Sequence, residues 1–171
     1  MAKVTTCIFI FLLAACQSGP DVKSRIVELE DQLSQAPNQE VLQSLVGLYE
    51  EAYQQSEEPE EKLEFLWKSG ETARALRDYT KAENAFVEIY EKYPESEQAS
   101  KALFMHAFMM DEDLKAFDKA RGLYENFISR YPDSDFTDDA QFLLQNLGKT
   151  DEEMLEFLQQ QNQEQGAEIQ G

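Results

Sequence analysis

Few residues of this chain could make or break covalent bonds in a catalytic reaction. The only cysteines are Cys7 and Cys16, so residues 17–171 hold no thiol that could act as a nucleophile or form a disulfide. His106 is the only histidine, which excludes a metal site with two histidine ligands. For the same reason, a Ser–His relay would have no second histidine to act as a base. It lies beside Ala107 in the first helix of a repeat, and we interpret it as a packed or half-exposed helix residue.

Acidic residues are abundant, but their arrangement selects neither a catalytic pair nor a metal site. The 171 residues include 34 acidic and 15 basic side chains, for a net charge of −19. The acidic runs 111–113 and 138–139 lack the glycine turn around which calcium ligands alternate. The seven glycines are scattered and form no phosphate-binding loop. We therefore predict a protein that is not an enzyme and that holds no cofactor and no metal.

The strong negative charge also limits the classes of partner. Nucleic acids and anionic lipid surfaces are bound by clustered lysine and arginine, so neither is expected here. Hydrophobic residues make up 42% of the chain, which excludes a disordered protein. We interpret the acidity as a solvated helix surface, with attraction of basic partners or divalent cations as the alternative.

The N-terminal residues combine one basic residue with a short apolar run that ends in a cysteine. Lys3 precedes the run Cys7–Leu13, and two alanines lead into Cys16. This arrangement is typical of a secretory signal, since crossing a bilayer takes about 20 apolar residues. The ending Leu-Ala-Ala-Cys resembles the lipobox of bacterial lipoproteins, which implies that residues 1–15 are removed and that Cys16 is acylated, for example with palmitate. The alternatives are ordinary cleavage before the cysteine and a membrane anchor without a tail.

A repeated unit occupies the middle of the chain. Residues 82–96 match residues 120–134 at a constant offset of 38, and both segments end in Tyr-Pro, an acidic residue and Ser. The small residues Gly70 and Ala107, expected where two helices approach closely, are only 37 apart. The turn at 111–116 has therefore gained one residue.

Within each unit the apolar residues recur with the spacing of an α-helix. In the first unit they predict two helices joined by a turn at Arg77–Asp78. The two apolar sets are Leu63, Leu66, Trp67, Gly70, Ala73 and Leu76, and then Ala82, Phe86, Ile89, Tyr90 and Tyr93. One such pair of helices cannot bury its apolar face alone, so stacking of successive pairs completes the core.

Local signals predict where several of these helices begin and end. The two Thr-x-x-Glu sequences, Thr80–Glu83 and Thr150–Glu153, fit capping boxes at helix N-termini. Pro94 and Pro132 are expected to end helices, because proline cannot continue the backbone hydrogen bonds.

The pattern of small, aromatic and proline residues resembles the tetratricopeptide repeat. The residues that carry the resemblance are Gly70, Asp78, Tyr79, Ala82, Phe86 and Pro94, followed by Ala107, Phe117, Ala120, Tyr124 and Pro132. It covers residues 63–147 and implies an all-α, right-handed helix–turn–helix solenoid with capping helices. The long period and the Tyr-Pro-acid-Ser ending are similar to those of a Gram-negative envelope subgroup. That subgroup includes the lipoprotein of the outer-membrane β-barrel assembly machine and the periplasmic protein that coordinates the Tol-Pal system.

The first helix of each tetratricopeptide pair lines a concave groove, so the resemblance implies a protein-binding groove. By position, the groove residues are Glu64, Trp67, Glu71, Lys101, Phe104, Phe108, Asp139, Phe142 and Asn146. Aromatic rings flanked by charges could anchor an extended or helical peptide. The alternative is that Trp67, Phe104 and Phe108 are core residues, because aromatic side chains at helical spacing usually are.

The chain divides into five expected segments. They are a signal peptide (1–15), the lipidated cysteine with a short tether (16–20), N-terminal capping helices or a degenerate repeat (21–60), the repeats with a C-terminal cap (61–162) and a glutamine-rich disordered tail (163–171). The apolar stripe Val22–Leu33 predicts a first helix packed on the solenoid, with a short coiled coil as the alternative. The cap is expected to close the stack with Met154, Leu155 and Leu158.

These observations predict a membrane-anchored, non-catalytic adaptor that binds another cell-envelope protein. Gln17 follows the lipidated cysteine where aspartate would resemble a signal for retention in the inner membrane, so we expect an outer-membrane anchor and a domain facing the periplasm. More specific alternatives are an accessory of β-barrel assembly and a Tol-Pal-like coordinator of cell-wall synthesis that oligomerises through Val22–Leu33. Less favoured alternatives are a structural spacer and an enzyme.

Overall fold

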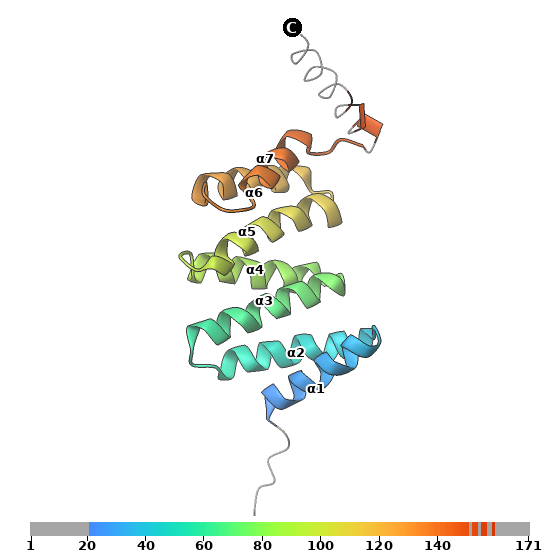
Figure 1. The fold of residues 1–171 in the computed structure, drawn as a ribbon, viewed down its shortest axis with the longest axis vertical. Coiled ribbons are helices and arrows are strands. Elements are labelled where there is room, and N and C mark those ends of the chain that lie inside the picture. Colours follow the sequence, from blue (N-terminus) through green and yellow to red (C-terminus); the bar gives the residue numbers. More distant parts are fainter. Residues whose placement is uncertain (1–20, 151, 154, 157–158, 160–171) are drawn as a thin grey trace, which may run out of the picture.

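The computed structural model describes residues 21–150 and, beyond these, residues 152–153, 155–156 and 159. All regular elements in this part of the chain are helical, and each helix packs on the next to form one stack (Figure 1). The elements are α1 (Val22–Gln35), α2 (Gln39–Gln55), α3 (Pro59–Ala75), α4 (Tyr79–Lys92), α5 (Glu97–Phe108), a π-helical turn (Met109–Asp113), α6 (Phe117–Arg130) and α7 (Thr137–Asn146). The predicted signal peptide, Cys16, the tether, the cap residues Met154 and Leu158 and the 163–171 tail lie outside the described residues. The third predicted cap residue, Leu155, is 58% exposed, so its side chain does not close the stack as predicted.

The first helix packs on the solenoid, as the apolar stripe predicts. Val22 and Ile26 of α1 are buried, and Leu29 and Leu33 pack beside them. Their partners come from the next two helices and are Leu45, Leu48, Tyr49, Ala52 and Phe65. The apolar stripe of α1 is therefore covered by α2 and α3 of the same chain. It is not available to pair with another helix in a coiled coil.

A second and larger core runs from α2 to α7. It depends on close contact between α3 and α4 at Gly70. A Cβ atom added there would lie 2.7 Å from Cε1 of Phe86, whose ring is fully buried. Ala107, the matching residue of the next repeat, is also fully buried. The predicted close approach at these small residues is confirmed.

The extra residue in the second repeat is absorbed as a π-helical turn. In the first repeat the amide of Asp78 donates to the carbonyl of Ala73 at 2.9 Å, closing the turn between the helices. The equivalent bond in the second repeat, from Ala116 to Met110 at 2.7 Å, spans one residue more. Both turns then place one residue in the left-handed region, Arg77 at φ 61° and Lys115 at φ 51°. The two repeats thus reach the same geometry with different numbers of residues.

The capping predictions were right at one site and wrong at the other. The Thr150 hydroxyl accepts from the amide of Glu153 at 3.2 Å, and the Glu153 carboxylate accepts from the amide of Thr150 at 2.8 Å, which confirms that capping box. The Thr80–Glu83 box is wrong, because α4 begins at Tyr79 and is capped by Asp78, whose carboxylate accepts from the amide of Lys81 at 3.2 Å. An aspartate before the helix satisfies the free amides first.

Both proline predictions are confirmed, and the segments that they create pack on one another. Helix α4 ends at Lys92 and α6 at Arg130, each two residues before its proline. The Tyr131 hydroxyl donates to the carbonyl of Pro94 at 3.1 Å, and Arg130 donates to the carbonyl of Tyr90 at 3.0 Å. These bonds fix the second repeat on the first.

Candidate functional site

Two pockets lie at equivalent places in the two repeats. Each combines the end of a first helix, the turn that follows it and the first helix of the next repeat. The first pocket, of about 310 Å³, is lined by Glu71, Arg74, Ala75, Arg77, Tyr79, Met105 and Asp113. The second, of about 430 Å³, is lined by Asp111, Glu112, Lys115, Phe117, Leu143, Asn146, Gly148, Lys149 and Thr150. We call the surface that holds both pockets the pocketed face.

An offset of 38 residues relates the walls of the two pockets. The corresponding pairs are Arg77 and Lys115, Tyr79 and Phe117, and Met105 and Leu143. Because the repeat reproduces the backbone, both pockets open on the same side of the stack. Their spacing along the stack is that of successive repeats, which suits an extended ligand that contacts both.

The first pocket is occupied by its own ion pair. Nε of Arg74 donates to Oδ2 of Asp113, and each side chain is only 25% exposed. The guanidinium carbon of Arg74 also lies 5.2 Å from the centre of the Phe108 ring, a cation–π arrangement. A carboxylate and an aromatic ring from the second repeat thus hold a cation from the first.

The second pocket contains a buried carboxylate. Asp111 is 4% exposed, and the hydroxyl of Tyr124 donates to it at 3.4 Å. Burial raises the pKa of Asp111, because the charged form loses its hydration, and the nearby Glu112 raises it further. Burial and the Asp111 charge likewise raise the pKa of Tyr124, so the phenol stays neutral.

The other polar groups of the second pocket hold one another. Glu112 accepts from Nζ of Lys115 at 3.0 Å. Asn146, itself 4% exposed, donates from Nδ2 to the carbonyl of Phe142 at 2.7 Å and accepts from Nζ of Lys149 at 2.8 Å. Asp111 therefore differs from its neighbours in having only a long bond to a neutral group.

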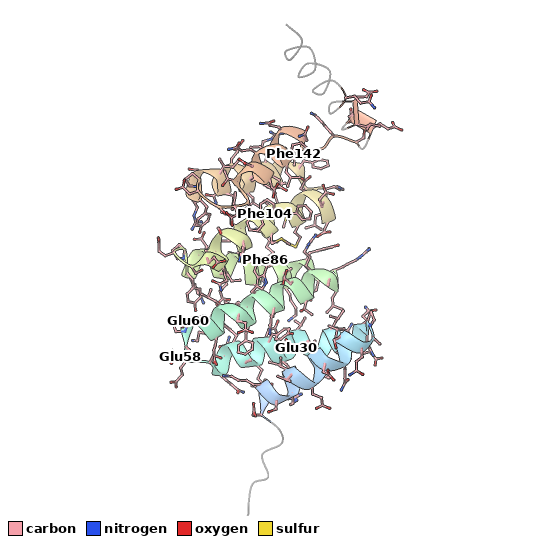
Figure 2. The ribbon with its side chains drawn as sticks, viewed as in Figure 1. Glu30, Glu58, Glu60, Phe86, Phe104 and Phe142 are labelled. Carbon is pink, nitrogen blue, oxygen red and sulfur yellow. The ribbon has the colours of Figure 1, made fainter. Side chains whose placement is uncertain are left out.

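The structure places the predicted aromatic row in three different environments. Trp67 of α3 is half-buried, with its ring centre 5.8 Å from that of Phe86. Phe104 of α5 is 9% exposed and lies in the core. Phe142 of α7 is 42% exposed. Figure 2 shows Phe104 inside the stack and Phe142 near its C-terminal end. Of the two roles left open for Phe104, the structure shows the core.

Neighbouring rings explain why Phe104 is buried. Its ring lies 5.0 Å from that of Phe136 and 5.7 Å from that of Phe127, measured between ring centres. The Phe108 ring also stacks on that of Phe104, with 6.3 Å between ring centres, and it remains half-buried under Arg74. Phe108 thus contributes to the pocketed face through Arg74, whereas Phe104 belongs to the core.

The polar residues of the predicted groove are also divided. Glu71 lines the first pocket and Asn146 the second. Glu64 is exposed and pairs with Lys68 at 2.9 Å, and Lys101 pairs with Glu97 at 2.6 Å along its own helix. The last member of the set, Asp139, is exposed at the start of α7.

Half of the residues that line the two pockets come from the turns, which the groove prediction did not include. Arg74 and Asp113 were missed because their contact joins two repeats. Asp111 and Lys115 were missed because the acidic run was interpreted as a solvated turn. One signal could have found them, namely the single extra residue at 111–116, since an irregular turn in a regular repeat often marks a functional position.

His106 is a packed residue, as predicted. It is 5% exposed, and Nδ1 lies 3.1 Å from the hydroxyl of Tyr90. Burial lowers the pKa of His106 and outweighs the attraction of Glu83, whose carboxylate lies 3.4 Å from Nε2. Within the described part of the chain, no cluster of three or more His, Cys, Asp or Glu could hold a metal ion. Nor is any described helix long and apolar enough to cross a bilayer.

The comparison with protein families agrees with this geometry. The tetratricopeptide repeat model matches residues 64–96 and 101–134, which cover most of α3–α4 and of α5–α6. These segments are tetratricopeptide repeats. The predicted all-α solenoid is therefore confirmed, and repeats of this kind are protein-interaction modules. No curated protein and no solved structure matches the chain.

Proposed function

We propose that this protein is a membrane-anchored, non-catalytic adaptor that binds a segment of another cell-envelope protein on its pocketed face. The observation that carries the proposal is the repetition of one pocket at the same place in two tetratricopeptide repeats. Paired pockets, each with an aromatic wall and charged side chains, suit a peptide whose successive side chains enter them. The net negative charge of the protein would raise the association rate of a basic partner.

The chemistry of the pockets supports binding rather than catalysis. The first pocket holds a closed ion pair, and the second holds side chains bonded to one another. Neither arrangement presents a nucleophile next to a base. The protein then acts by holding its partner near the membrane at a high local concentration.

The anchor in this proposal is an acyl group on Cys16, and the domain faces the periplasm from the outer membrane. Support comes from the Leu-Ala-Ala-Cys sequence and from Gln17. The first described helix begins at Val22, so few residues separate it from that cysteine. Metabolic labelling with an alkyne fatty acid tests the anchor. Label should appear on the wild type and be lost in Cys16→Ser, and label that persists in the variant would refute acylation at this residue.

The two more specific versions of the proposal receive unequal support. A Tol-Pal-like coordinator that oligomerises through Val22–Leu33 loses its structural basis, because that stripe packs on α2 and α3. An accessory of β-barrel assembly needs only the pocketed face and remains compatible with the fold. The partner captured from this face would decide between them.

Photo-crosslinking in living cells tests the binding face directly. Phe117 is a suitable probe position, because it lines the second pocket and is 38% exposed. A p-benzoyl-phenylalanine residue there keeps an aromatic side chain in place. Val27 of α1, which is 65% exposed, is the matched control on a surface away from the pockets.

We expect one discrete adduct from position 117 and none from position 27. Mass spectrometry of that adduct would name the partner and its pathway. Equal capture at both positions would contradict the proposal, because the control is the more accessible site. Absence of any adduct from position 117, in a chain that folds normally by circular dichroism, would favour the structural spacer.

A further inference from the structure

Asp111 is a buried carboxylate that forms no ion pair with any described residue. It is 4% exposed, and its one hydrogen bond among described residues comes from the neutral hydroxyl of Tyr124 at 3.4 Å. The positive charge of Lys115 acts on Asp111 and lowers its pKa, but the ion pair that Lys115 forms is with Glu112, at 3.0 Å. A charged group that is removed from water and left without an ion-pair partner destabilises the fold. Such groups are therefore normally paired or have a functional role.

The position of Asp111 in its helix increases that cost. It lies in the π-helical turn that continues α5, close to the C-terminal end, where the backbone carbonyls already carry partial negative charge. A carboxylate is unfavourable there for the same reason that a cation is favourable. Single π-turns within helices occur frequently at functional sites. Stability therefore does not explain why an acid is placed here.

The first pocket shows what such a carboxylate could bind. Arg74 precedes Asp111 by 37 residues and occupies the equivalent helix position, and its guanidinium is held between Asp113 and the Phe108 ring. That pocket supplies both the cation and the acid from this chain. The second pocket has an acid, Asp111, where the first has Arg74, and this acid forms no ion pair with a described residue.

Two lysines also line the second pocket, and their ammonium groups donate to Glu112 and to Asn146. Two other walls suit a cationic side chain. The Phe117 ring is 38% exposed and offers an aromatic surface for a cation–π contact. Helix α7 ends at Asn146, and Gly148 follows in the left-handed region at φ 77°, so the carbonyl end of that helix lies at the pocket. A helix C-terminus favours positive charge.

We infer that the second pocket binds a lysine or arginine side chain of the bound protein segment, with Asp111 as its counter-ion. This inference rests on the proposed function and specifies the chemistry of the partner. The partner's cation would pair with an acid of the second pocket, as Arg74 pairs with Asp113 in the first. A basic partner also suits a protein with a net charge of −19.

Two short peptides test this inference on the purified domain by NMR. The probe is acetyl-Leu-Lys-Leu-amide, and its match carries norleucine in place of lysine. We expect the lysine peptide to shift the amide signals of Asp111, Glu112 and Asn146 and to bind about tenfold more tightly than its match, as for a desolvated charge pair. Asp111→Asn should abolish this difference. Asp118→Asn removes an exposed charge outside the pocket lining and should preserve it.

Three results would overturn the inference. They are equal affinity for the two peptides, a difference that survives in Asp111→Asn, and signal changes confined to residues outside the second pocket or absent altogether. The thermal midpoint of each variant shows whether the fold is retained. If any of these peptide results occurs while the probe at position 117 still captures a partner, the adaptor function stands. Only the inferred preference for a cationic side chain is then wrong.

Discussion

The two pockets lie at equivalent places in the fold, but only the first is filled by an ion pair of the chain itself. In the first, Arg74 and Asp113 neutralise one another across the repeat boundary. In the second, Asp111 is buried beside a neutral phenol. The repeat therefore dictates where a pocket forms, while a few side chains decide whether it is filled from within. A filled pocket contributes to the stability of the stack, and an unfilled one is available to a ligand.

A second difference separates the interior of the stack from its last described helix. Phe104 and Phe142 hold equivalent positions, but only Phe104 is covered by rings from α6 and from the segment before α7. The same residue type thus belongs to the core in one repeat and to the surface in the next. Exposure here follows from the position in the stack rather than from the local sequence.

The largest expected effect tests the difference between Phe104 and Phe142. Phe104→Ala should lower the free energy of unfolding by about 3–5 kcal/mol, because it removes a buried ring and leaves a cavity. Phe142→Ala should lower it by less than about 1 kcal/mol, since that ring is already 42% exposed. Urea unfolding monitored by circular dichroism measures both. Similar losses in the two variants would mean that Phe142 is also a core residue.

A smaller effect concerns the close contact that shapes the first repeat. Gly70→Ala should destabilise the protein by about 1–3 kcal/mol, because its Cβ atom would overlap the buried Phe86 ring. Gly47→Ala, in an open part of α2, is the matched control and should stabilise the protein by about 0.5–1 kcal/mol. Thermal unfolding of both variants shows whether each substitution stabilises or destabilises the protein. A stabilising Gly70→Ala would contradict the tight packing of α3 on α4.

The two aspartates of the pockets should respond in opposite directions. Asp113→Asn should cost about 1 kcal/mol at pH 7, because Arg74 loses its partner in a partly buried site. Asp111→Asn should increase stability at the same pH. Its folded-state pKa lies above the ordinary value of 3.8, so the charged form opposes folding at neutral pH and this penalty disappears as the pH falls. Losses of equal size in both variants would mean that Asp111 is satisfied internally.

The smallest effect is a pH dependence that only the first repeat boundary should show. His106 faces Tyr90, Glu83 and Lys119, whereas its equivalent 38 residues later is Leu144. Its pKa is lowered below 6.5 in the folded state, so the unfolded chain takes up the proton first and stability should fall as the pH drops below 6.5.

The variant His106→Gln isolates this contribution. Between pH 7 and pH 5 the wild type should lose more stability than the variant, as measured by urea unfolding across that range. Parallel curves for the two proteins would show that protonation of His106 is not coupled to folding.

The sequence predicted the fold well because each element depends on local, repeated signals. Apolar periodicity placed α3 and α4, the proline residues marked the ends of α4 and α6, and the constant offset located the inserted residue. The functional surface was harder to predict because it depends on contacts between elements. Phe136, which covers Phe104, lies in an irregular segment, and Asp113 meets Arg74 only because the π-turn directs it there.

The most direct test of the account compares partner capture in three backgrounds. A p-benzoyl-phenylalanine residue at position 117 is placed in the wild type, in Asp111→Asn and in Asp113→Asn, and the yield of the same adduct is measured in cells. We predict that Asp111→Asn lowers the yield about tenfold, because the partner's cation loses its counter-ion, and that Asp113→Asn leaves most of it. Full capture in Asp111→Asn, or an equal loss in both variants, would contradict the claim that the second pocket is the one left for a ligand.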